Sequence, residues 1–273
     1  MMNMKHGILV ISHGSREQSW VKAVDEAVEA ARQQWLANAS DEAERASRSI
    51  IPVYSSYLEL VEGHLIQDGI DKLEQEGVTH IHVMPLFVSS GSSHVDEIKQ
   101  AFGFEPACDF IGDLEPFRFG AHISFDEPIG VEPEVVRILQ KQIEEQLNPE
   151  HEEAVLLLGH GSSMTYFYEK WEAGMQQLAA VLGDKLNVQK VAYAPLLPDG
   201  SRAALVELKQ ITPHVIVIPL FISPGYFTRH VIPARLDGLD YTYKGSTLLP
   251  HSEMSKLLCR RFESYALDKE CTQ

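Results

Sequence analysis

The chain has 273 residues, of which 44% are hydrophobic, and a formal net charge of −16. Its length allows two domains of ordinary size, and its composition is that of a globular protein rather than a disordered one. The acidic balance argues against nucleic-acid binding, which needs basic residues to neutralise phosphates. Apolar runs fall short of the roughly 18–20 residues that span a bilayer, so we expect no membrane partner.

The N-terminal sequence and the cysteines indicate the compartment. The residues M-M-N-M-K-H-G lead into the first predicted strand without the apolar segment of a signal peptide. Cys108, Cys259 and Cys271 form no C-x-x-C motif and no disulfide framework. We therefore expect a cytoplasmic protein whose cysteines are structural or incidental.

Short apolar strands alternate with amphipathic helices through the first half. The strand at 7–12 is apolar throughout, as is typical of a strand buried on both faces. A helix at 17–37 carries an apolar stripe, and the polar stretch 38–49 is expected to be a link. The further elements predicted in this half are a strand at 50–55, a helix at 62–76 ended by Gly77, a strand at 80–87, a helix at 94–102, a strand at 119–125 and a helix at 131–147.

The second half repeats the first. Residues 8–16, I-L-V-I-S-H-G-S-R, correspond to residues 155–163, V-L-L-L-G-H-G-S-S. The run I-H-V-M-P-L-F-V-S-S-G at 81–91 corresponds to V-I-V-I-P-L-F-I-S-P-G at 215–225. Such repetition predicts two copies of one structural unit. The elements predicted in the second copy are strands at 154–159, 188–194, 214–222 and 241–247, and helices at 165–183, 200–210, 227–236 and 251–266.

These patterns predict an α/β fold with two tandem domains, residues 1–147 and 154–273. Helices that alternate with short apolar strands favour a parallel sheet covered by helices on both faces. The segment between the two copies contains Asn148-Pro149 and is predicted to be the domain linker. We expect a cleft between the two domains.

Three candidate functional side chains follow three strands of the first copy. They are His13, Glu59 and His94. Ligand sites in parallel sheets lie beyond the carboxyl ends of the strands, so these side chains are expected to share one site. Two imidazoles and a carboxylate can bind a divalent transition metal with positions left open, or take protons from a weak acid. Each side chain also has a structural alternative, because a histidine can bond its own loop and a glutamate can mark a helix entrance.

The chain resembles the sirohydrochlorin chelatases, class II tetrapyrrole chelatases that insert Co²⁺ or Fe²⁺ into a tetrapyrrole without ATP. The matching segments span most of residues 7–140. They are I-S-H-G-S-R at 11–16, Y-L-E-L-V-E at 57–62, G-V-T-H-I-H-V-M-P-L-F at 77–87, the loop with His94, and I-S-F-D-E-P-I-G-V-E-P-E-V-V at 123–136. In the long form of the family two such domains are fused, which the second half resembles.

The resemblance implies roles for the three side chains. His13 and His94 would bind the metal, and with Glu59 they would accept the two pyrrole protons that the metal displaces. The divalent metal, Co²⁺ or Fe²⁺ with Ni²⁺ as a further candidate, would be a substrate, and no organic cofactor is expected. The partners would be this metal and a polycarboxylate tetrapyrrole, bound by local donors because the protein is acidic. The candidate donors are Ser12, Ser15, Arg16, Ser89, Ser90 and Ser93, with Ser15 also predicted to cap the first helix.

The chain departs from the family pattern at several places. In the family the loop histidine typically comes one residue sooner, where this chain has Ser93. In the second copy His160 keeps the His-Gly-Ser motif, but Ser163 replaces the arginine and residues 191–200 contain no glutamate. His230 lies deeper in its predicted helix than His94. The second copy is therefore expected to be a degenerate repeat without catalytic function.

Two other classes of function remain. A phosphatase with a nucleophilic histidine would normally have an arginine directly before His-Gly, where this chain has Ser12 and Gly159. A metal or tetrapyrrole carrier on the same fold would bind the same ligands without turnover. A carrier could dispense with Glu59, whereas proton handling during metal insertion requires it.

Overall fold

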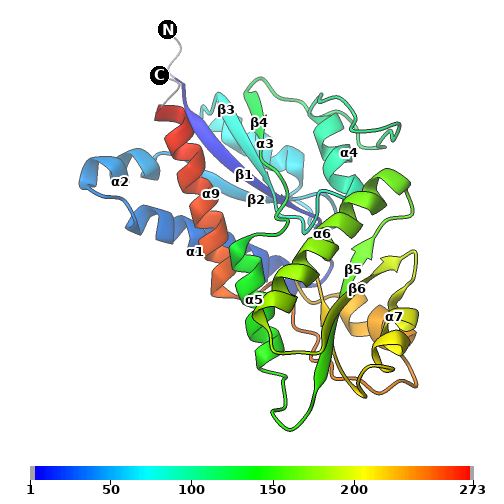
Figure 1. The fold of residues 1–273 in the computed structure, drawn as a ribbon. Helices are drawn as coiled ribbons and strands as arrows, with labels where there is room; N and C mark the ends of the chain where they lie inside the picture. Colours follow the sequence, from blue (N-terminus) through cyan, green and yellow to red (C-terminus); the bar gives the residue numbers. More distant parts are fainter. Residues whose placement is uncertain (1–3, 271–273) are drawn as a thin grey trace. The chain divides into compact units, whose positions relative to one another are not determined.

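The computed structural model describes residues 4–270, which form two compact units that interleave along the chain. Of the described residues, unit 1 consists of 4–87, 94–128 and 251–270, and unit 2 consists of 88–93 and 129–250. Each unit contains a parallel sheet with helices packed against it (Figure 1). The predicted α/β class with two parallel sheets is confirmed.

Unit 1 is built on a four-stranded parallel sheet in the order β2-β1-β3-β4. Its central strand β1 is fully buried from Ile8 to Ser12, because it has a neighbour on each side and helices on both faces. The strands are β1 (His6–Ser12), β2 (Val53–Tyr57), β3 (His80–Pro85) and β4 (His122–Phe125). The helices are α1 (Gln18–Ala37), α2 (Glu42–Ser49), α3 (Ile66–Gln75), α4 (Ser93–Ala101) and α9 (Ser252–Glu270).

The register of this sheet places three strand ends at one edge. Ile11 of β1 lies opposite Ser56 of β2 and Pro85 of β3. The residues that follow each strand therefore emerge side by side at the carboxyl edge of the sheet. This is the edge at which the sequence predicts the site.

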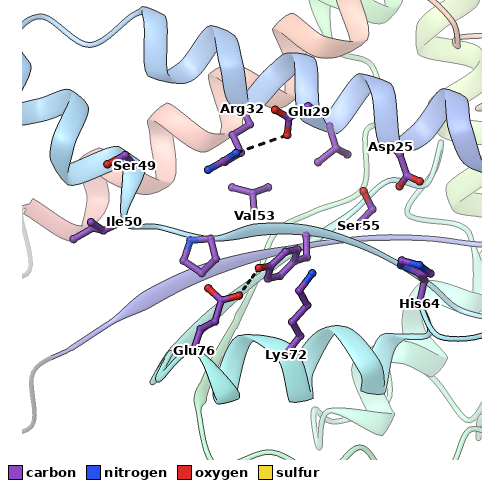
Figure 2. Close-up of a pocket in the computed structure, with 13 residues that line it drawn as sticks. Asp25, Glu29, Arg32, Ser49, Ile50, Val53, Ser55, His64, Lys72 and Glu76 are labelled. Atoms are coloured by element: carbon purple, nitrogen blue, oxygen red, sulfur yellow. Dashed lines mark hydrogen bonds and ion pairs between the residues drawn. The ribbon is translucent and has the colours of Figure 1, made fainter.

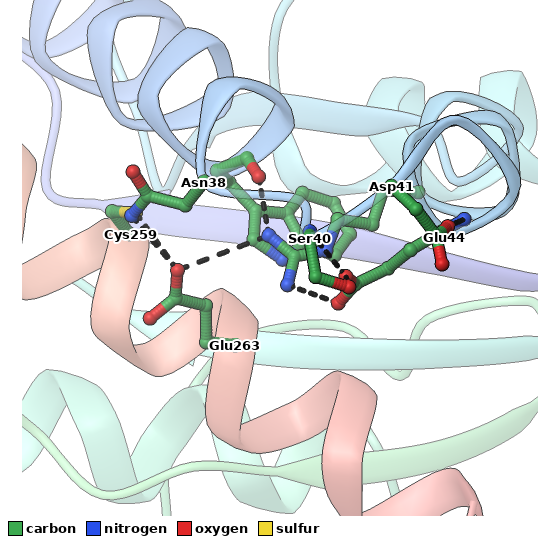
Figure 3. Close-up of polar contacts among 8 residues, drawn as sticks. Asn38, Ser40, Asp41, Glu44, Cys259 and Glu263 are labelled. Carbon is green, nitrogen blue, oxygen red and sulfur yellow. Dashed lines mark hydrogen bonds and ion pairs between the residues drawn. The ribbon is translucent and has the colours of Figure 1, made fainter.

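Helix α9 comes from the end of the chain but packs beside α1 in unit 1 (Figure 1). Trp35 of α1 and Phe262 of α9 are fully buried, with ring centres 5.8 Å apart. Figure 3 shows polar contacts in this region, among them those of Glu44 and those of Glu263 on α9. Arg48 donates to the backbone oxygen of Trp35, pairs with Glu44 and lies 3.8 Å from Glu263, which also accepts from Asn38. The C-terminal helix is thus bound to unit 1 by an aromatic contact and an ion-pair network.

Unit 2 is built on a three-stranded parallel sheet in the order β6-β5-β7. The central strand β5 is buried from Glu153 to Gly159. The strands are β5 (Glu153–Gly161), β6 (Lys190–Leu197) and β7 (His214–Pro219). The helices are α5 (Pro133–Glu144), α6 (Thr165–Lys185), α7 (Ser201–Leu208) and α8 (Ile232–Arg235), the last preceded by a π-helical turn, η1 (Phe227–Val231).

Two predicted elements differ from the structure. The polar stretch 38–49, expected to be a link, contains the helix α2, because Asp41 caps it by accepting from the Glu44 backbone N–H and Arg48 anchors its last turn. The segment 241–247, expected to be a strand, makes only the isolated bridge between Thr242 and Ile216. Gly245 turns the backbone at a φ of +67° soon after this bridge.

The packing units do not follow the sequence repeat. Residues 129–147 pack with unit 2, and residues 251–270 pack with unit 1. The division of the sequence into copies 1–147 and 154–273 therefore stays a prediction about the repeat. Within residues 4–270, the helices are all too short or too polar to cross a membrane.

Candidate active site

The turn after β1 presents His13. Gly14 has a φ of +97°, and a Cβ at this position would lie 2.0 Å from the backbone oxygen of Glu59. Only glycine fits such a left-handed residue against a neighbouring backbone. Nδ1 of His13 lies 3.3 Å from the Gly14 carbonyl oxygen. Because a carbonyl only accepts, this contact places a proton on Nδ1, and in the neutral ring the lone pair is then on Nε2.

Glu59 lies beside His13 because the loop after β2 continues along the end of β1. The backbone N–H groups of Leu58 and Glu59 donate to Ser12 and His13, at 2.9 and 3.1 Å. The Glu59 carboxylate is 3.7 Å from Nδ1 of His13, and both side chains are partly exposed. The next residue, Leu60, has a φ of +68°, the strained backbone often found at functional sites.

His94 lies in the first turn of α4, which begins one residue before the helix predicted at 94–102. Its ring meets that of His13 edge to face, with the two centres 4.8 Å apart. Imidazole nitrogens bind zinc at about 2.0–2.1 Å, so two rings at this separation are close enough to share one ion. The structure therefore brings His13, Glu59 and His94 of unit 1 together.

Glu97 is a neighbour of His94 that the sequence analysis did not single out. Its Oε2 lies 3.4 Å from Nδ1 of His94, and its Oε1 accepts from the Asp113 backbone N–H. The carboxylate is nearly buried, at 10% exposure, which fixes its position. A carboxylate on Nδ1 orients the ring and leaves the lone pair on Nε2. The spacing of three residues on one helix is the signal that could have found it.

The predicted substrate-binding residues of unit 1 have different environments. Ser12 is fully buried, and its Oγ has no hydrogen-bond partner within the described residues. Ser15 accepts from the Glu17 backbone N–H. The prediction that Ser15 caps the first helix is wrong, because α1 begins only at Gln18 and has Glu17 at its N-cap position. Arg16 is exposed.

The serines of the loop after β3 belong to unit 2. Ser89 is buried, and its Oγ accepts from the Gly91 backbone N–H, while its carbonyl accepts from Ser92. Ser90 is exposed and Ser93 is half-buried. Gly91 is held against Phe167 and Trp171 of α6, where a Cβ would lie 2.4 Å from the Phe167 backbone oxygen. The loop is therefore anchored by its backbone, and its exposed hydroxyls remain available for contacts.

A groove of about 460 Å³ lies elsewhere in unit 1, along the edge strand β2 between α1 and α3 (Figure 2). None of His13, Glu59 and His94 lines it. Its acidic side chains already have partners: Asp25 accepts from the Tyr57 hydroxyl, Glu76 from the Tyr54 hydroxyl, and Glu29 pairs with Arg32. We assign this groove no catalytic role.

The described side chains contain no cluster of three or more His, Cys, Asp or Glu residues with the geometry of a complete metal site. A metal that is consumed as a substrate has to be released, so an open set of ligands suits it better than a closed one. The two imidazoles can present such an ion, and Glu59 adds a negative charge beside them. This arrangement can combine metal delivery with proton acceptance.

Sequence comparison matches the chain to known proteins over both copies. The CbiX family model matches residues 7–146 and 154–265. A sirohydrochlorin ferrochelatase of Bacillus subtilis (strain 168) is 29% identical over 160 residues, which cover 59% of this chain and 52% of that protein. A sirohydrochlorin cobaltochelatase of Methanopyrus kandleri is 29% identical over 105 residues, which cover 34% of this chain and 73% of that protein.

Solved structures share the fold over nearly the whole chain. SirB from Bacillus subtilis with Fe³⁺ superposes with a TM-score of 0.69 at 21% identity and covers 98% of both chains. The sirohydrochlorin chelatase SirB from Bacillus subtilis subspecies spizizenii, in complex with cobalt, has a TM-score of 0.65 at 21% identity. It covers 98% of this chain and 97% of that one.

Proposed function

Since the chain belongs to the CbiX family of sirohydrochlorin chelatases, in its two-domain form, we propose that it inserts a divalent metal into sirohydrochlorin without ATP. The observation that carries the proposal is the proximity of His13, Glu59 and His94 at the carboxyl edge of the unit 1 sheet. Sirohydrochlorin is the substrate in the names of both sequence relatives. The metal is Co²⁺ or Fe²⁺, with Ni²⁺ as a further candidate.

In this proposal the two histidines present the metal to the ring. The neighbours of each Nδ1, the Gly14 carbonyl oxygen and the Glu97 carboxylate, both favour a proton on that nitrogen. The neutral rings then offer their Nε2 lone pairs, which is the form that binds a metal. Glu97 is a positioning residue that acts on the metal only through His94.

The proton balance requires acceptors near the metal. As the ion enters the ring, two pyrrole N–H bonds break, their electron pairs bind the metal and two protons leave. Because the ion leaves Nε2 of both histidines as it enters the ring, each freed lone pair can take one of the two protons. Glu59 can then accept the Nδ1 proton of the doubly protonated His13, because its carboxylate is 3.7 Å from that nitrogen and half exposed to solvent. The same carboxylate offsets the charge of the incoming ion.

The peripheral carboxylates of the substrate need donors, which we propose to be Ser15, Arg16, Ser89, Ser90 and Ser93. Arg16 and Ser90 are exposed, which suits this role best. Ser12 is fully buried, so its contribution to the site is through the backbone that supports His13. We further propose that the first copy, residues 1–147, carries the catalysis and that the second copy, residues 154–273, is a degenerate repeat. The protein is proposed to be cytoplasmic.

A metal-insertion assay tests the proposal. Purified protein is incubated with sirohydrochlorin and Co²⁺ under anaerobic conditions, and the absorbance spectrum is followed against a protein-free control. We expect insertion well above the control rate. Insertion at the control rate, with the ring still bound, would instead identify a carrier.

The Glu59→Gln variant tests proton handling in the same assay. Loss of a general base typically costs about 10²- to 10⁴-fold in rate, so we expect a loss in this range. Glu62→Gln is the matched control, because Glu62 is an exposed glutamate in the same loop. Equal rates for the two variants would remove Glu59 from the mechanism.

A further inference from the structure

The last two residues of β5 in unit 2 reproduce the backbone of the turn after β1. Gly161 has a φ of +76°, and a Cβ there would lie 2.2 Å from the Leu197 backbone oxygen, as a Cβ on Gly14 would lie 2.0 Å from that of Glu59. Nδ1 of His160 lies 3.0 Å from the Gly161 carbonyl oxygen. The two segments therefore present their histidines in the same way.

The strand pairing identifies which residue replaces Glu59. In unit 1, Ser12 pairs with Tyr57, so Gly14 lies level with Glu59 two residues later. In unit 2, Gly161 pairs directly with Leu197. Leucine thus stands where the first copy has its carboxylate, and its side chain is 41% exposed.

An aromatic residue replaces His94. The ring of Phe227 meets that of His160 with centres 4.9 Å apart, close to the 4.8 Å between His94 and His13. In the first copy, His94 comes nine residues after Pro85, the last residue of β3. The same count from Pro219, the last residue of β7, leads to Thr228. This threonine is buried, and its hydroxyl donates to the Gly225 carbonyl oxygen. The π-helical turn brings Phe227 onto His160 instead, and such turns occur frequently at functional sites.

The surface around this second histidine is apolar, with hydrogen-bond donors at its rim. Tyr226, beside Phe227, is 67% exposed, so its ring is open to a ligand. Arg229 and His230 follow on the same turn and are exposed. A planar apolar molecule with carboxylates at its edge matches this pattern, because its face can pack on the rings while its carboxylates accept from the Arg229 guanidinium and the His230 ring.

We propose that Leu197, Tyr226, Phe227 and the His160 ring form a binding site for the free-base tetrapyrrole, which takes the macrocycle in the absence of metal. The second copy has exchanged its metal-binding groups for ring-binding ones. This inference rests on the proposed function, since it assumes that a tetrapyrrole is the substrate.

Binding of metal-free sirohydrochlorin to the full-length protein, with a chelator present, tests the site. The Leu197→Glu variant sets a carboxylate against the ring and its carboxylates, so we expect the Kd to rise about tenfold or more. Tyr226→Ala removes an aromatic contact, for which we expect about a two- to tenfold rise. Ile211→Glu is the matched control, because Ile211 is 50% exposed in unit 2 but precedes β7 at the opposite edge of the sheet.

The outcomes separate this inference from the proposed function. If the wild type inserts metal while Leu197→Glu and Tyr226→Ala bind the ring as tightly as the wild type, the inference is overturned and the function stands. If the wild type binds the ring, both variants weaken binding and metal is not inserted, the inference stands and the insertion proposal fails. If the wild type binds no ring, both are wrong.

Discussion

Gly14 is the residue on which the presentation of His13 depends. A methyl group there would overlap the Glu59 backbone oxygen, at 2.0 Å, in addition to the cost of a positive φ. Relaxing this overlap requires the Glu59 loop to move away from β1. One added carbon atom at residue 14 would therefore disturb the positions of both His13 and Glu59.

We predict that Gly14→Ala destabilises the protein by about 4 kcal/mol or more. Gly77→Ala is the control, because Gly77 has a φ of +81° but nothing within 4 Å of its Cβ position. It should cost only the left-handed strain of about 1–2 kcal/mol. Urea unfolding of both variants measures the difference, and equal losses would show that the contact with Glu59 is unimportant.

Glu44 provides a pH-dependent contribution to the stability of unit 1. Hydrogen bonds from Ser40, first from its hydroxyl and then from its backbone N–H, together with Arg48, lower the Glu44 pKa from 4.5 to about 2. Because the folded pKa is the lower one, the ionised carboxylate stabilises the fold. This contribution is complete above about pH 4.5 and is lost as the pH falls towards 2.

The Glu44→Gln variant should therefore unfold at a lower temperature than the wild type at pH 7, and the difference should shrink steadily below pH 4.5. Thermal unfolding followed by circular dichroism at several pH values measures this. Glu42→Gln, an exposed neighbour on the same helix, is the control. A difference that is independent of pH would contradict the role of the Glu44 charge.

Among the helices, α9 contributes to a unit that begins some 250 residues earlier in the chain. Phe262 is fully buried against Trp35 of α1. We predict that Phe262→Ala costs about 3–5 kcal/mol, through lost burial and the cavity left behind. Leu267→Ala on the same helix, 62% exposed, should cost within about 0.5 kcal/mol. Denaturant unfolding compares the two, and a small effect of Phe262→Ala would mean that α9 is dispensable for unit 1.

Periodicity and strand-end motifs were sufficient to predict most elements and the group at the edge of the unit 1 sheet. The strand at 7–12 and the helix at 17–37 are local patterns, and both appear within one residue of the prediction. The helix α2 was missed because it has no apolar stripe and depends on Asp41 and on the distant Glu263. Such support from another part of the chain leaves no local signal.

The site contains features that the sequence could not supply. Nothing in the sequence indicates that Phe227 rather than His230 stands beside His160, because this depends on the π-helical turn. The partnership of Glu97 with His94 does have a local signal in its spacing. Likewise, α5 belongs to the first copy in the sequence but packs in unit 2, and α9 ends the second copy but packs in unit 1. This arrangement depends on tertiary contacts alone.

At the scale of the whole molecule, the net charge of −16 opposes the approach of a polycarboxylate substrate. Salt screens this repulsion, since the Debye length falls from about 30 Å at 0.01 M to about 8 Å at 0.15 M. We predict that kcat/KM for sirohydrochlorin rises over this range. The rate of the protein-free reaction at each salt concentration is the control. A steady fall instead would mean that attraction by local cations dominates the encounter.

The central claim is that His13 and His94 bind the incoming metal together, and a crystal structure of the protein soaked with Co²⁺ tests it most directly. We predict Co²⁺ bonded to Nε2 of both rings, with Glu59 beside it and no ion at His160. Cobalt bound elsewhere while these two imidazoles remain without a metal would contradict the account.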